Sequence, residues 1–162
     1  MKRGEIMGKI DRGRMVRNNR QICIQMELLA NSVMAKAELT AVQAHILQYV
    51  FRHCDRGTSL TEIHRDFGCS MAALSGMVKR LREKGYIRVE CCARDDRCKL
   101  LFPTEKGRQI QPFLNETTRQ IQQQLYGCLS SEELTTLDHL QNKLLDNLTQ
   151  LTQLKSKEVS NQ

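Results

Sequence analysis

The stretch SLTEIHRDFGCSMAALSGMVKRLREKGYI, residues 59–87, contains two helical patterns joined by a very short turn. Ser59 and Glu62 form a capping-box signature, in which each side chain satisfies a backbone N–H at the start of a helix. Gly68 is typical of the residue that ends such a helix. We therefore expect a first helix at about 59–66, followed after a tight turn by a second one.

The second helix leads directly into a β-hairpin. Ser70 and Gly85 mark the start and the stop of a helix over about 70–84. After Gly85 the apolar period changes from about 3.6 residues to 2, in residues 86–91 and again in residues 98–102, which indicates two short strands. Helix, turn, helix and hairpin in this order form a winged helix-turn-helix, in which the second helix enters the major groove of DNA.

Four further helices are expected outside this segment. Apolar residues at helical spacing predict a helix from about Asn18 to Lys36, and capping boxes predict helices at 40–53 and 130–154. A long helical tract follows from Thr104 to about Tyr126. It contains Pro112, where a kink or a break is expected because proline lacks the backbone N–H.

The last of these helices carries a stripe of leucines spaced three or four residues apart. Such a stripe would leave a large apolar ridge in water unless another surface covers it. We expect a second copy of the chain to cover it. The alternative is that the N- and C-terminal helices of one chain pack on each other. The leucines are Leu134, Leu137, Leu140, Leu144, Leu148, Leu151 and Leu154.

These patterns predict a mainly α fold with a small β-hairpin wing, flanked by N- and C-terminal dimerisation helices. The segments are expected to be a basic, mobile tail at 1–17, an N-terminal dimerisation helix at 18–38, a winged helix-turn-helix lobe at 39–107, C-terminal dimerisation helices at 108–155 and a tail at 156–162.

Charge favours a nucleic-acid partner. The chain of 162 residues has 25 basic and 18 acidic side chains, a net charge of +7. Residues 1–20 hold seven basic and two acidic side chains (+5), and residues 59–107 hold ten and seven (+3). Positive charge concentrated in this way points to double-stranded DNA first and to an anionic membrane second. With no apolar run of membrane-spanning length, no membrane insertion is expected.

The cysteines argue against a secreted disulfide scaffold. There are seven, an odd number, and no signal-peptide pattern precedes them. We therefore expect a cytoplasmic protein with reduced thiols, and neither a metal nor a cofactor. Catalysis is not expected, because the four histidines are scattered and the chain has no HExxH motif or phosphate-binding glycine loop.

The outward face of the second helix is the expected DNA-reading surface. Small side chains there would allow the backbone to approach the groove floor, while basic ones would reach phosphates. The alternative is a close helix–helix contact inside the core. The candidate residues are Ser70, Ala72, Ala73, Ser75, Gly76, Lys79 and Arg80.

The tip of the hairpin supplies the second candidate contact. We expect Arg97 to enter the minor groove, Asp95 to orient it and Arg94 to meet phosphate, with Lys99 on the return strand. The alternative is a solvated turn whose ion pairs stay internal and contribute little stability.

The chain resembles the MarR family of winged-helix regulators over about residues 20–150. The resemblance rests on linked pieces in the family's order: LTAVQAHIL at 39–47, the stretch 59–87, DDR at 95–97, LFPTEKG at 101–107 and LSSEELTTLDHLQNKL at 129–144. It implies a homodimer that binds a pseudo-palindromic operator, usually as a repressor released by a small ligand or by thiol oxidation.

The resemblance also implies positions for the sites. By position, the recognition residues fall on Ala72, Ala73, Ser75, Gly76 and Lys79, and the wing residues on Asp95 and Arg97. Val89 stands where the family commonly has an arginine, so the ion pairing of the wing would use Arg88 or Arg94 instead.

The resemblance further implies an effector pocket between the dimerisation helices and the DNA-binding lobe. It would draw on Ile22, Met26, Leu47, Phe51 and Phe113, although for each of these residues an ordinary place in the core is the preferred interpretation.

Two other interpretations stay open. Cys23 resembles the reactive cysteine of the family's organic-hydroperoxide sensors, although a small buried hydrophobic residue is the simpler interpretation. A non-specific DNA-binding protein or a dimeric interaction module would also account for part of the pattern.

Overall fold

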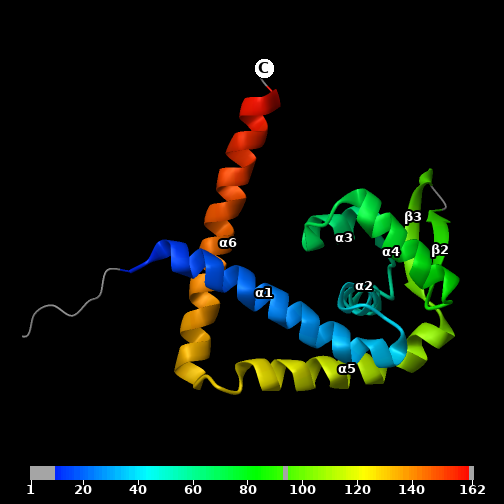
Figure 1. The fold of residues 1–162 in the computed structure, drawn as a ribbon. Coiled ribbons are helices and arrows are strands. Elements are labelled where there is room, and N and C mark those ends of the chain that lie inside the picture. The colour runs from blue at the N-terminus through cyan, green and yellow to red at the C-terminus, as the bar shows by residue number, and fades with distance from the viewer. Residues whose placement is uncertain (1–9, 93–94, 161–162) are drawn as a thin grey trace, which may run out of the picture. The chain divides into compact units, whose positions relative to one another are not determined.

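The structure is a computed structural model that describes residues 10–92 and 95–160. Its elements are α1 (Arg12–Met34), the 3-10 helix η1 (Ala35–Ala37), α2 (Ala41–Arg52), β1 (Thr58–Ser59), α3 (Leu60–Phe67), α4 (Met71–Glu83), β2 (Ile87–Cys92), β3 (Asp95–Pro103), α5 (Glu105–Tyr126) and α6 (Ser131–Ser160) (Figure 1). The chain divides into two units, Met1–Ile121 and Gln122–Gln162. The mainly α fold with a β wing is confirmed.

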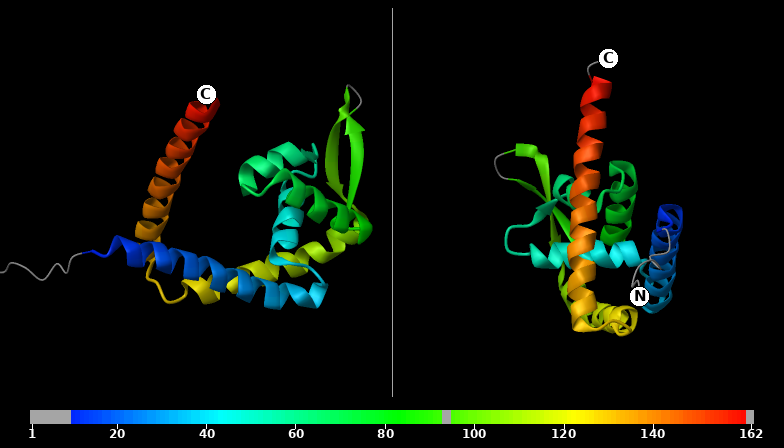
Figure 2. Two further views of the ribbon diagram at one scale, coloured as in Figure 1. Left: turned by 45° about the horizontal axis from the view of Figure 1, so that its top comes forward. Right: turned by 90° about the vertical axis from the view of Figure 1, so that its left-hand side faces the viewer.

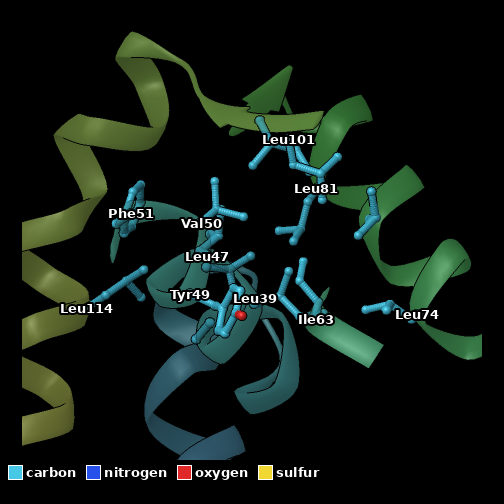
Figure 3. Packing of buried hydrophobic residues seen from close by; sticks show 14 of the residues in the cluster. Leu39, Leu47, Tyr49, Val50, Phe51, Ile63, Leu74, Leu81, Leu101 and Leu114 are labelled. Atoms are coloured by element: carbon cyan, nitrogen blue, oxygen red, sulfur yellow. The ribbon is translucent and has the colours of Figure 1, made fainter. Parts of the chain in front are cut away.

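The core of the first unit forms around α2. Ile46, Leu47 and Val50 on this helix are fully buried. Side chains from the loop before α2 and from α3, α4, β3 and α5 surround them (Figure 3). Burying each of these side chains contributes about 1.5–3 kcal/mol. Because all three lie on α2, this helix is the centre of the core. The labelled residues around it include Leu39, Ile63, Leu74, Leu81, Leu101 and Leu114.

The sheet has three antiparallel strands in the order β1-β3-β2, whereas the sequence predicts two. Thr58 pairs with Leu101 and Ser59 with Leu100. Strand β1 escapes prediction because two residues show no period, and because Ser59 is also the N-cap of α3. Figure 2 shows β2 and β3 extending together as a hairpin from the rest of the lobe.

Helix α1 begins earlier than expected. The predicted start near Asn18, with residues 1–17 as a tail, is wrong for residues 12–17, which are helical. Asp11 is the reason, because its carboxylate accepts a hydrogen bond from the Arg14 N–H at 2.9 Å and so caps the helix. Residues 12–28 of α1 are all exposed.

Helix α5 continues through Pro112, so of the two expected outcomes, a kink or a break, the break is wrong. A proline removes one backbone hydrogen bond of the helix. Pro112 is exposed, and α5 packs against the rest of the lobe through its opposite side. That side includes the buried Leu114, and the side-chain amide of Gln48 in α2 donates to Thr118 Oγ1 at 2.8 Å.

Helix α6, in the second unit, starts at the predicted capping box of Ser130 and Glu133 and runs to Ser160. Leu134 and Leu137 are half-buried. Beyond them a leucine ridge lies in solvent, each side chain about half exposed: Leu140, Leu144, Leu148, Leu151 and Leu154.

Candidate nucleic-acid interface

Two capped helices form the centre of the candidate site. The Ser59 hydroxyl accepts from the Glu62 N–H at 3.2 Å, and the Glu62 carboxylate accepts from the Ser59 N–H at 2.9 Å. Gly68 then ends α3 in the left-handed conformation, with φ of 64°. Ser70 caps α4 by accepting from the Ala73 N–H at 3.2 Å. The predicted helix-turn-helix is thus built from the capping residues that the sequence indicated.

His64 closes the turn between these helices. Its Nδ1 lies 2.7 Å from the carbonyl oxygen of Cys69, so the ring donates when its proton is on that nitrogen. The bond ties the last turn of α3 to the loop before α4. Two turn contacts, the Gly68 cap and this histidine, therefore fix how α4 leaves α3.

Helix α4 has one apolar face and one outward face of small and basic residues. Leu74, Val78 and Leu81 are buried. At 3.6 residues per turn, Ala72, Gly76 and Lys79 lie on the opposite side. All the predicted contact residues on α4 are exposed except the half-buried Gly76: Ser70, Ala72, Ala73, Ser75, Lys79 and Arg80.

The small residues of α4 are not explained by packing inside the chain. A Cβ added at Gly76 would meet nothing within 4 Å. Ala72 and Ser75 are exposed in the same region. The alternative of a close helix–helix contact in the core is therefore wrong, and the backbone of α4 is open to approach by a partner.

The positive charge of this face is available to a ligand. Lys79 Nζ lies 3.8 Å from Glu83 Oε1, and both side chains are well over half exposed. Exposed pairs of this kind contribute about 0–1 kcal/mol, so the lysine can exchange this partner for a phosphate at little cost.

The wing is described only at its base. Lys99 on β3 is exposed and pairs across the sheet with Cys91. Asp95 and Arg97 lie on β3, but their side chains are outside the described part of the structure, and Arg94 lies outside the described residues altogether. The roles expected for these three residues stay predictions.

Arg88 holds the base of the wing rather than its tip. Its guanidinium donates to Glu90 at 2.7 Å and to the carbonyl oxygen of Pro103 at 2.8 Å. It also lies 5.1 Å from the centre of the Phe102 ring. The arginine beside Val89 is therefore engaged with β2 and β3 where they leave the lobe.

Sequence reasoning missed a cluster at the start of α3. The Glu62 carboxylate accepts from the Arg56 guanidinium at 2.8 Å and from the Thr58 hydroxyl at 3.0 Å, in addition to its capping bond with Ser59. The hydrogen bond from Arg56, then the one from the Ser59 N–H, lowers the pKa of Glu62 from 4.5 to about 2. The capping box identified Glu62, but nothing in the sequence indicated its partners Arg56 and Thr58.

We expect Glu62→Gln to destabilise the chain by about 1–2 kcal/mol at neutral pH, because the amide cannot replace the charge-assisted bonds. Since the folded-state pKa of Glu62 is the lower one, its contribution is present above pH 4.5 and is lost as the pH falls from 4.5 towards about 2. Urea unfolding at a series of pH values measures the difference between wild type and variant, which should shrink over this range.

Glu116→Gln is the matched control, because the pKa of that carboxylate is also lowered to about 2 but its main partner is Arg119 on the same exposed helical turn. A loss from Glu62→Gln no larger than from the control, or one that persists unchanged at low pH, would contradict the assignment.

The five expected pocket residues do not gather in one place. Leu47 and Phe51 belong to the buried core, and Phe113 packs against it. Ile22 and Met26 are instead exposed on α1, 52% and 37% respectively. For the first three residues the structure supports the core interpretation.

Cys23 is a free, exposed thiol on α1, so the interpretation of Cys23 as a buried hydrophobic residue is wrong in the single chain. Within residues 10–92 and 95–160, no cluster of three or more His, Cys, Asp or Glu is suited to a metal ion. None of the helices in the same ranges is both long and apolar enough to cross a bilayer.

Comparison with known proteins agrees with this geometry. Residues 39–99 match the model of the MarR family. The structure is similar to MepR of S. aureus in complex with DNA, with a TM-score of 0.77 and 22% identity over 86% of this chain and 99% of that one. It is also similar to a cysteine-to-serine mutant of E. coli MarR in complex with operator DNA, with a TM-score of 0.74 and 23% identity over 82% and 94%.

A third similar structure is a protein from Bacillus cereus assigned as a MarR-like transcription regulator, with a TM-score of 0.73 and 20% identity over 84% of this chain and 96% of that one. At these identities the three structures establish the fold, and the matched segment 39–99 spans α2 to β3. The helix-turn-helix lies within that segment, as do Arg88 and Lys99 at the base of the wing. Residues 39–99 therefore match the MarR family of transcription regulators, and the chain shares the fold of these three structures.

Proposed function

We propose that the protein is a homodimeric repressor that binds a pseudo-palindromic DNA operator through α4 and the wing and is released by a small-molecule effector. The observation that carries this proposal is the outward face of α4. It combines an open glycine, small side chains and two basic residues, none of which has a structural role in the described core.

Each feature of this face suits the major groove. Ala72 and Ala73 can contact thymine methyl groups, and Ser75 can bond a base edge or a phosphate. Lys79 and Arg80 carry charge further along the helix, where phosphates flank the groove. Gly76 lies between these groups, so the backbone can approach more closely than any side chain would allow.

The homodimer is supported by two apolar surfaces that the single chain leaves exposed. One is the leucine ridge of α6, and the other is the side of α1 that carries Met15, Ile22 and Met26. Monomers rarely leave apolar areas of this extent in water. The E. coli and S. aureus relatives were solved with operator DNA and with DNA, which supports a DNA partner for this chain as well.

Selection from a pool of random duplexes tests the proposal. A dimer should recover an inverted repeat whose half-site centres lie about one helical turn apart, roughly 34–36 Å. Binding to the selected duplex should weaken steeply with salt. Equal affinity for every duplex would reject sequence-specific regulation in favour of non-specific DNA binding, and no affinity for any duplex would leave a dimeric interaction module.

Two substitutions on α4 should separate phosphate contact from base contact. Lys79→Ala should weaken binding to all duplexes about equally. It should also lower by about 1 the slope of log affinity against log salt concentration. Gly76→Ala should lower the affinity for the selected duplex more than the affinity for a random one, because the added methyl group holds the helix away from the groove floor. Fluorescence anisotropy measures both, and Lys143→Ala on exposed α6 controls for loss of one charge. A Lys79→Ala variant that behaves as the control would contradict the assignment.

The effector arm of the proposal is tested on the same complex. A compound library screened for release of the selected duplex should yield ligands that also raise the melting temperature of the protein, since a ligand stabilises the state it binds. Peroxide treatment of wild type and Cys23→Ser forms a separate arm. Release that peroxide causes in wild type alone would favour the thiol sensor.

A further inference from the structure

The C-terminal end of α4 is held from two sides by the elements that precede and follow the lobe. We name this cluster the α4 anchor and define it by Glu38, Lys84, Gly85, Thr104 and Lys106. Lys84 and Gly85 follow directly on α4, Glu38 follows η1 at the end of α1, and Thr104 and Lys106 lie at the start of α5. The anchor therefore joins the expected recognition helix to both flanking arms.

On the α5 side, the anchor provides partners for carbonyl groups that a helix end leaves free. The Lys106 ammonium donates to the carbonyl oxygen of Lys84 at 2.8 Å, and the Thr104 hydroxyl donates to that of Gly85 at 2.6 Å. Lys106 also lies 4.9 Å from the centre of the Tyr86 ring. A cation at the C-terminus of a helix is favourable in itself. Here it also fixes the start of α5 against the end of α4.

On the α1 side, the side chain of Lys84 adds a hydrogen bond to the packing of Met34 and Leu39 in the common core. The ammonium of Lys84 donates to the carbonyl oxygen of Glu38, 46 residues earlier in the chain. Glu38 has φ of 55°, the left-handed conformation that side chains other than glycine rarely adopt. Glu38 therefore has an unfavourable backbone conformation at the point where its carbonyl oxygen accepts the bond from Lys84. Departures from local backbone preference of this kind are expected at functional positions.

We infer that Lys84 is a positioning residue: its bond to Glu38 fixes α4 against the end of α1, and so sets which half-site spacing the dimer accepts. The inference rests on the proposed function. In a dimer the two copies of α4 must meet grooves whose separation changes by about 3.4 Å for each added base pair. The bond adds a direct link between the end of α1 and the end of α4, beside the packing of both helices in the common core. Removing it should therefore loosen the spacing requirement and not the phosphate contacts.

The test compares Lys84→Met with Arg82→Met. Both remove one positive charge at the end of α4, but the Arg82 side chain is exposed and has no role in the anchor. The probes are the duplex selected by wild type, the same duplex with one base pair inserted or deleted between the half-sites, and a random duplex. Melting curves establish that each variant is folded, which is expected because the lost hydrogen bond is at the surface.

We expect Lys84→Met to lower the discrimination between the native and altered spacings about fivefold or more, the lower end of measured coupling between sites. Its affinity for the random duplex should fall no further than that of Arg82→Met. Lys84→Arg, which keeps a cationic donor, should restore the discrimination. Lys106→Met, which removes the parallel bond from α5, should lower it as well.

Two results would overturn the inference. One is an equal loss on every duplex, which would make Lys84 a phosphate contact. The other is unchanged spacing discrimination in Lys84→Met, whatever the result for Lys106→Met. Both results bear on the inference only when wild type first selects a spaced inverted repeat. If wild type selects none, the proposed function itself fails, and the two failures are thereby distinguished.

Discussion

Gly107→Ala should destabilise the protein by about 3 kcal/mol, at the upper end of what overpacking usually costs. A Cβ built at Gly107 would lie 2.2 Å from the carbonyl oxygen of Tyr86 and 3.2 Å from its carbonyl carbon. Both atoms are backbone, and the oxygen already accepts a hydrogen bond from the Thr104 N–H at 3.1 Å. Neither group can move without separating the start of β2 from the start of α5.

Gly76→Ala is the matched control for this experiment. It makes the same change inside a helix, but the added Cβ meets nothing within 4 Å. Alanine there should stabilise the protein by about 0.5–1 kcal/mol, because glycine is the poorer helix former. Denaturant unfolding of both variants measures the difference. If Gly107→Ala stays within about 1 kcal/mol of wild type, well below the usual cost of overpacking, the close approach of α5 to Tyr86 is not required for stability.

The second large effect is expected on α6. The double variant Leu144→Glu and Leu151→Glu should dissociate the proposed dimer, because both leucines lie on the leucine ridge and are about half exposed in the single chain. If the dimer buries the exposed half of each side chain at about 1 kcal/mol, the four leucines of the two copies contribute about 4 kcal/mol, and the dimer dissociation constant should rise about a thousandfold. Sedimentation equilibrium measures this, and affinity for a two-half-site operator should fall with it.

Asn142→Glu with Thr149→Glu gives the same change in charge on the side of α6 away from the ridge. Both residues are exposed. This control should remain as dimeric as wild type. A ridge variant that stays dimeric at micromolar concentration would show that other surfaces, such as the exposed side of α1, hold the two copies together.

The helices were predictable where local signals agreed with tertiary packing. The capping boxes at Thr40, Ser59 and Ser130 all form, and each starts a helix within one residue of its predicted position. The exposed face of α4 was also predictable, because a helical period with buried Leu74, Val78 and Leu81 leaves only one side for the small and basic residues.

The rest depends on contacts that are distant in sequence. Strand β1 exists because Thr58 meets Leu101, and the partners of Glu62 come from a loop with no pattern of its own. The bond from Lys84 to Glu38 joins the end of α4 to a residue 46 positions earlier, after α1 and η1. Ile22 and Met26 show a further limit, since a single chain does not determine what covers an exposed apolar residue on α1.

The two-residue strand β1 has a consequence for the thermodynamics of recognition. Ser59 pairs with Leu100 in the wing and at the same time caps α3, so the strand that leads to the wing and the helix-turn-helix share one backbone position. Their relative placement is therefore settled when the lobe folds. The entropy cost of ordering the base of the wing relative to α4 is therefore incurred during folding. Less binding free energy is then lost to ordering these elements when a duplex binds.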